Sequence, residues 1–150
     1  VFSHDHLGNM FSVVLFPHRW LFENQEAWHT GNSIGFGSDI EDAKGIDHPP
    51  VTAGAFFAAK LGVAEYLLEK KCQASALVLR EIRPEYAVPV GVWQIREAIR
   101  SAMKNEPYIA ENFDDGITFA AKRMSVSKSE WLSKGNMLSM LKQKSISDFF

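Results

Sequence analysis

The stretch "ASALVLREI", residues Ala74–Ile82, predicts a β-strand, and its position between two helix-forming segments decides the fold class. It is a short apolar run, and "RPEYAVPVG" directly after it breaks the pattern. Before it, "VTAGAFFAAKLGVAEYLLEKK" (51–71) predicts an Ala-rich helix, whose apolar stripe consists of Phe57, Leu61, Ala64 and Leu68. This helix is apolar on more than one side, so we expect it to be largely buried.

A second strand and a second helix complete the clear elements. "MFSVVLF" (Met10–Phe16) stops at Pro17 and predicts a buried strand, whereas "RWLFENQEAW" after it is ambiguous. "VWQIREAIRSAMK" (92–104) predicts an amphipathic helix. The residues expected to face inward are Val92, Ile95, Ile99 and Ala102, and those expected to face water are Gln94, Glu97, Arg100 and Lys104.

The order strand, helix, strand, helix predicts a single α+β domain with a small mixed sheet packed by helices. Two clear strands are too few to predict a parallel wound sheet. "HTGNSIGFGSDIEDAKGIDHPP" (29–50) is a loop on composition, and the closing Pro49 and Pro50 suit the first turn of the helix that follows.

A sharper local signal lies at "VSKSEW" (Val126–Trp131). Ser127 and Glu130 have capping-box spacing, and Val126 and Trp131 occupy the two hydrophobic-staple positions. A short helix is expected here, ended by Gly135-Asn136. We therefore expect a globular domain over residues 1–134 and a flexible tail over residues 135–150.

The composition allows one domain with a substantial core: 150 residues, 46% hydrophobic and 23% charged. No stretch approaches the roughly 20 apolar residues that cross a bilayer, so no membrane contact is expected. A signal-peptide pattern is absent, and the single Cys72 cannot form an internal disulfide, which favours the cytoplasm. Because the first residue is Val1, we expect the C-terminal part of a longer protein.

The tail ends in "QKSISDFF" (Gln143–Phe150). In one tight helical turn Ile146, Phe149 and Phe150 share a face, while the Gln143 amide is free to make hydrogen bonds. Burial of three such side chains yields about 5–9 kcal/mol, less the cost of ordering the backbone, which indicates micromolar binding. The alternative is that the tail folds back and its aromatic rings complete the core of the domain itself.

This tail is similar to the box by which many replication and repair proteins dock on the sliding clamp PCNA. That resemblance implies that Gln143 fills a small polar pocket of the clamp and that Ile146, Phe149 and Phe150 fill its hydrophobic pocket. Together with "SHDHLGNMFSVVLFP" (3–17) and "RPEYAVPVGVWQIREAIR" (83–100), the tail resembles the archaeal Nre family, over the whole chain.

The family resemblance implies a DNA-repair factor recruited by PCNA, acting near DNA at the nucleoid. It implies no reaction, so the catalytic residues are unknown. The alternative is a metal- or nucleotide-dependent DNA-processing enzyme that the same tail delivers to the clamp. From Ala121 onward six Lys or Arg stand against two acidic residues, which fits either a nearby polyanion or a solvated linker.

Two groups of residues are candidates for such chemistry. His4 and His6 alternate along an extended segment and so face the same way, as two ligands of a divalent metal would. Further oxygen ligands would come from Asp39, Glu41 and Asp42, or from Asp114 and Asp115. The alternative is a polar strand end with solvated imidazoles.

"GNSIGFGSD" is the second candidate, with Gly31, Gly35 and Gly37 cradling phosphate through backbone N–H groups. It lacks the Walker Lys-Ser/Thr, so a tightly turning loop is the alternative. Four arginines, Arg80, Arg83, Arg96 and Arg100, are candidates for phosphate contacts or for ion pairs with Glu81, Glu85 and Glu97. Trp20, Trp28 and Trp93 are candidates for stacking on bases or for the core.

Overall fold

The structure is a computed structural model that describes residues 1–86 and 90–142. Its strands are β1 (Phe2–His6), β2 (Asn9–Phe16), β3 (Leu21–Thr30), β4 (Ser33–Asp42) and β5 (Ser75–Ile82). Its helices are α1 (Gly54–Lys70), α2 (Trp93–Ala102), α3 (Phe113–Ala121), α4 (Lys128–Lys134) and α5 (Met137–Lys142). None of these helices is long and apolar enough to cross a membrane.

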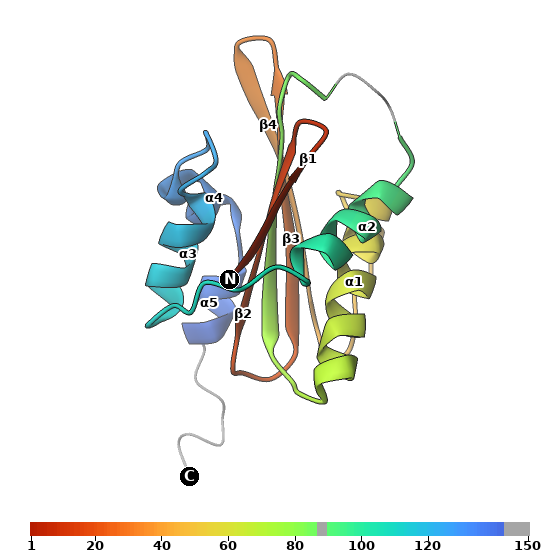
Figure 1. Cartoon of the computed structure of the whole chain (residues 1–150), viewed down its shortest axis with the longest axis vertical. Coiled ribbons are helices and arrows are strands. Elements are labelled where there is room, and N and C mark those ends of the chain that lie inside the picture. Colours follow the sequence, from red (N-terminus) through yellow and green to blue (C-terminus); the bar gives the residue numbers. More distant parts are fainter. Residues whose placement is uncertain (87–89, 143–150) are drawn as a thin grey trace.

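One sheet joins the five strands in the order β1-β2-β5-β3-β4. Strand β5 pairs parallel with β3, and the other neighbours pair antiparallel. Helices α1 and α2 cover one face, and α3, α4 and α5 cover the other (Figure 1). The predicted α+β fold with a mixed sheet is thus confirmed, with both predicted strands adjacent at its centre.

Each face of the sheet has its own hydrophobic core. Under α1 and α2, Phe22 and Phe56 meet edge to face with ring centroids 5.2 Å apart. Under α3, α4 and α5, the buried Trp131 packs edge to face on Phe36. Because β2 and β5 alternate between the two cores, their residues are buried on both sides.

The loop expected over residues 29–50 is wrong for residues 29–42, because β3 continues to Thr30 and strand β4 spans Ser33–Asp42. Gly35 and Gly37 lie beneath the indole of Trp28, and a Cβ on Gly35 would lie 2.1 Å from Trp28 Nε1. These glycines provide space for a large ring on the neighbouring strand, a role that looks like loop composition in the sequence.

The orientation predicted for α1 is also wrong. The buried stripe of α1 is Phe56, Ala59, Val63 and Leu67. The predicted stripe faces outward, with Phe57 48%, Leu61 43% and Leu68 79% exposed. Both stripes are apolar, so periodicity alone had no means of choosing between them. Helix α1 begins at Gly54, four residues after Pro50. Helix α3 was not predicted from the sequence.

The capping box at Ser127 and Glu130 is confirmed, with both reciprocal hydrogen bonds present. Val126 and Trp131 are each 1% exposed, as expected for a staple. Packed residues continue past the expected boundary at residue 134, because α5 lies on the sheet with Met137 1% exposed. The "QKSISDFF" segment lies outside the described residues.

Three buried carboxylates of the sheet hold the connections between elements, and we call Glu23, Asp39 and Glu81 the carboxylate anchors. Glu23 accepts hydrogen bonds from the backbone N–H groups of Asn136 (2.7 Å) and Met137 (3.0 Å). Asp39 and Glu81 do the same for other connections: Asp39 accepts from the backbone of Val51 and Thr52, and Glu81 from that of Ser125 and Val126.

Glu81 is fully buried, and its pKa reflects two opposing effects. Burial alone would raise the pKa, but hydrogen bonds from Ser125, His29 and Val126 outweigh it and hold the pKa of Glu81 below its usual value. A carboxyl whose pKa is lowered on folding stabilises the folded state above its unfolded pKa. That contribution is lost as the pH falls through the lowered value.

We expect Glu81→Gln to lower the free energy of unfolding at pH 7 by about 2–4 kcal/mol, because an amide cannot accept all these hydrogen bonds. Urea denaturation at pH 7 and at pH 3 measures this, and the variant should lose less stability between the two than the wild type. Glu106→Gln, at an exposed position, is the matched control. Equal stability of both variants at pH 7 would contradict the anchor role.

Candidate functional site

A surface pocket of about 320 Å³ lies between the edge strand β1 and helix α2. Its lining includes His4, His6, Trp93, Gln94, Glu97 and Ser101. The two imidazole rings stack with centroids 5.9 Å apart and planes 20° apart, which confirms that they face the same way. The pocket thus combines three aromatic rings with one amide.

Local packing holds α2 against β1 at this place. Ile95 and Ile99 are buried in the core under α2, and Phe2 enters the same core from β1. The Asn105 side chain then donates from Nδ2 to the Ser3 carbonyl oxygen at 2.8 Å, just past the end of α2. These contacts make both walls of the pocket part of the packed domain.

Gln94 is the unexpected residue of the pocket. We expected it to face water, but it is only 2% exposed, and neither Oε1 nor Nε2 has a hydrogen-bond partner among the described residues. A buried polar group without a partner costs about 1–3 kcal/mol. A signal was present in the sequence, since Gln94 lies four residues before the buried Ala98 and therefore on the inner face.

Trp93, the residue before Gln94, is exposed to solvent. Trp93 is 57% exposed although tryptophan is usually covered. The sequence left open whether Trp20, Trp28 and Trp93 serve in stacking or in the core. Trp28 covers Gly35, and Trp20 donates from Nε1 to Glu41 at 3.1 Å. Trp93 alone of the three is more than one-third exposed.

The electrostatics of the pocket are close to neutral. Burial, followed by the nearby His6, lowers the pKa of His4, and Asp5 opposes this effect. The lowered pKa favours the uncharged form of the His4 imidazole. Glu97 at the rim is paired with Arg100 at 2.7 Å and with Arg96 at 3.4 Å. The pocket suits an uncharged planar group better than an anion.

The structure does not assemble the metal site predicted around His4 and His6. Asp39, Glu41 and Asp42 lie on β4, at the opposite edge of the sheet from β1. Asp114 and Asp115 lie in the first turn of α3, on the face of the sheet opposite α2 (Figure 1). Within residues 1–86 and 90–142, no three His, Cys, Asp or Glu side chains form a group able to hold a metal ion.

The predicted phosphate cradle also loses its structural basis. Gly35 and Gly37 belong to strand β4, and only Gly31 lies in the β3–β4 turn, with φ 58°. The Gly-rich run is therefore extended and does not wrap around a ligand.

Of the two roles considered for the four arginines, the structure shows ion pairs. Arg80 pairs with Glu26 at 2.7 Å in the interior, and Arg83 pairs with Glu81 at 3.3 Å. Burial raises the pKa of Glu26, and Arg80 acts against that rise.

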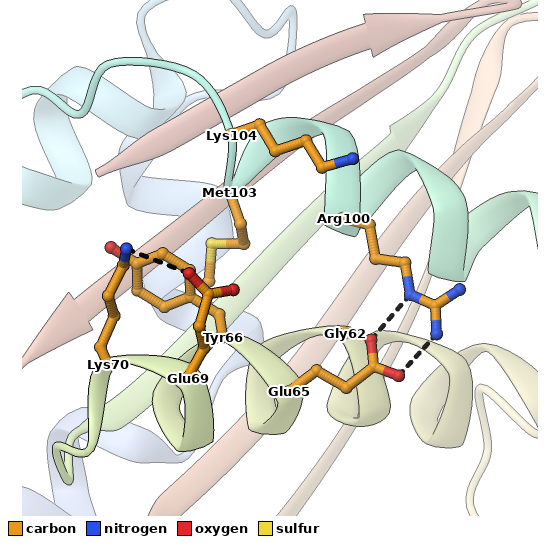
Figure 2. A pocket seen from close by; sticks show the side chains of 8 residues that line it. All are labelled: Gly62, Glu65, Tyr66, Glu69, Lys70, Arg100, Met103 and Lys104. Atoms are coloured by element: carbon orange, nitrogen blue, oxygen red, sulfur yellow. Dashed lines mark hydrogen bonds and ion pairs between the residues drawn. The ribbon is translucent and has the colours of Figure 1, made fainter.

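Arg100 forms two parallel hydrogen bonds with Glu65 across the α1–α2 groove (Figure 2). This groove has a volume of about 340 Å³, and Tyr66 and Met103 form part of its wall. Hydrogen bonds from Arg100 lower the pKa of Glu65, and the same pair raises the pKa of Arg100. Since both charges are already paired, the groove joins the two helices and offers no free charge from Arg100 to a ligand.

The fold and the pocket together define an α+β domain with a mixed sheet and a small, nearly neutral surface site. The family model for the C-terminal region of archaeal Nre proteins matches residues 41–149. The chain belongs to the archaeal Nre family. No solved structure gives a significant match.

Three relatives give the scale of the similarity. The DNA repair protein NreA of Archaeoglobus fulgidus is 38% identical over 158 aligned residues, which cover 100% of this chain and 38% of that protein. NreA of Haloferax volcanii is 38% identical over 99% of this chain and 37% of its own length. The DNA repair protein NreB of Archaeoglobus fulgidus is 29% identical over 94% of this chain. The chain thus spans less than half the length of each relative.

We expect Gly35→Ala to destabilise the fold by about 1–3 kcal/mol, because the added methyl group would overlap the Trp28 ring. Thermal denaturation measures the loss, with and without added phosphate. Gly31→Ala is the comparison, because nothing lies within 4 Å of its added Cβ and only the positive φ, about 1–2 kcal/mol, opposes it. If phosphate raised the melting temperature of the wild type but not that of Gly35→Ala, the result would support phosphate binding by the Gly-rich run.

Proposed function

We propose that this domain acts in DNA repair and is recruited to the sliding clamp PCNA by Gln143, Ile146, Phe149 and Phe150. The observation that carries the proposal is membership of a family whose relatives are named DNA repair proteins. The C-terminal "QKSISDFF" supplies the route of recruitment, because its spacing matches a PCNA-docking box. This function implies a cytoplasmic protein associated with the nucleoid.

The packed end of the domain suits such a tether. Glu23 holds the backbone of Asn136 and Met137, so α5 is fixed on the sheet, and it ends at Lys142, directly before Gln143. Eight residues span at most about 30 Å when fully extended. A clamp bound to this segment would therefore keep the domain beside DNA that threads the ring, at a high effective concentration.

The alternative of a metal- or nucleotide-dependent enzyme delivered by the same tail has no comparable support. It depended on a metal at His4 and His6 or on phosphate at the Gly-rich run. Neither arrangement is formed by the residues that the structure describes.

Isothermal titration calorimetry with archaeal PCNA tests the recruitment. The wild-type chain should bind with micromolar affinity, and the double variant Phe149→Ala, Phe150→Ala should bind at least about 30-fold more weakly, as expected for buried aromatic anchors. Ser147→Ala, whose side chain we expect to point away from the clamp, should bind like the wild type. Equal heats from the double variant and the wild type would exclude docking through this box.

Truncation separates docking from the alternative in which the tail completes the domain's own core. Removal of residues 143–150 should leave the melting temperature within about 2 °C of the full chain, because the docking residues then contribute nothing to the fold. By contrast, Met137→Ala should cost about 2–5 kcal/mol, since Met137 is buried on the sheet. A large loss of stability on truncation would show that Ile146, Phe149 and Phe150 belong to the core.

A further inference from the structure

We propose that the pocket between β1 and α2 binds one unpaired nucleobase of single-stranded DNA, with the Gln94 amide on the base edge and Trp93 on its face. This inference rests on the proposed role in DNA repair, and it names the part of the DNA that the domain contacts. It does not depend on the docking to PCNA.

The Gln94 amide provides the hydrogen-bonding half of the site. Its donor and its acceptor are both without a partner among the described residues. Gln94 lines the pocket but is only 2% exposed, so both amide atoms lie behind the pocket wall, and the side chain must turn toward the pocket to meet a base. The ligand that satisfies both atoms must offer an acceptor and a donor side by side. The edge of a nucleobase has this arrangement, and a planar amide can bond it with two parallel hydrogen bonds.

The aromatic residues provide the stacking half. Trp93 is 57% exposed at the pocket, and the His4 and His6 rings form a second aromatic surface on β1. Single-stranded nucleic acids are held mainly by stacking of bases on such side chains. An uncharged imidazole at His4, which its lowered pKa favours, removes the cost of covering a charge when a base enters.

Size and charge favour a base over a nucleoside triphosphate. The volume of about 320 Å³ lies at the small end of ligand pockets. Among the described residues, no lysine or arginine lines the pocket, and the nearby Arg96 and Arg100 are paired with Glu97. A triphosphate would therefore find no free cation, whereas the backbone of a DNA strand can remain outside in solvent.

The site also requires that the base be unpaired. In a duplex the Watson–Crick edge is occupied and both faces are stacked, so neither Gln94 nor Trp93 would reach its target without extrusion of the base. Repair intermediates expose single-stranded segments, and a pocket that reads single bases would position the domain on them.

Fluorescence anisotropy of labelled twelve-nucleotide DNA tests the proposal with the complete chain, in the absence of PCNA. The chain should bind single strands and bind the matching duplex at least tenfold more weakly. Trp93→Ala should weaken single-strand binding about tenfold, which corresponds to about 1.4 kcal/mol and lies within the range for loss of one stacked base.

Gln94→Leu separates binding from folding. It removes an unpartnered buried amide, so the melting temperature should rise or stay equal, while differences in affinity among dA, dC and dT strands should disappear. Leu68→Ala, an exposed apolar residue of α1 outside the pocket, is the matched control and should bind like the wild type. Unchanged binding by Trp93→Ala, base preferences that persist in Gln94→Leu, or equal affinity for duplex would each overturn the proposal.

The two proposals fail independently. Loss of PCNA binding with retained single-strand binding would remove only the recruitment step. Retained PCNA binding without single-strand binding would remove only the nucleobase site.

Discussion

The fold depends on the carboxylate anchors Glu23, Asp39 and Glu81, each buried in a different strand and each bonded to backbone N–H groups of a connection. Buried backbone N–H groups must find hydrogen-bond partners. In the segments that connect helices and strands, the regular backbone hydrogen bonds of the sheet do not supply these partners. Hydrogen bonds to an ionised carboxylate are the strong kind, which offsets part of the cost of burying the charge. The sheet therefore positions its helices through charged side chains as well as through apolar packing.

The anchors also tie the two layers of helices to opposite faces of the sheet. Glu23 and Glu81 hold the layer of α3, α4 and α5, which leads to the C-terminal segment. Asp39 holds the chain just before α1, in the opposite layer. Helix α2, which forms one wall of the β1–α2 pocket, covers that opposite face of the sheet (Figure 1). Helix α5 and the pocket therefore belong to opposite layers of the domain.

Local patterns predicted those elements in which one local interaction or one periodicity dominates. The strands at Met10–Phe16 and Ala74–Ile82 and the capping box at Ser127 are of this kind. Strand β4 was missed because Gly35 serves a ring on another strand, and that partner is not visible in its local sequence. The inner face of α1 was misassigned because two apolar stripes compete, and only the sheet decides which one is buried.

The sequence by itself determined the α+β class, the helix start at Ser127 and the family resemblance, because each follows from short local stretches and their order along the chain. Only the tertiary structure decided which polar residues are functional candidates. It separated His4 and His6 from every acidic residue proposed to join them, and it placed Gln94 beside them with no hydrogen-bond partner in the described part of the chain. Burial and partnership depend on contacts between distant segments, so no local pattern contains them.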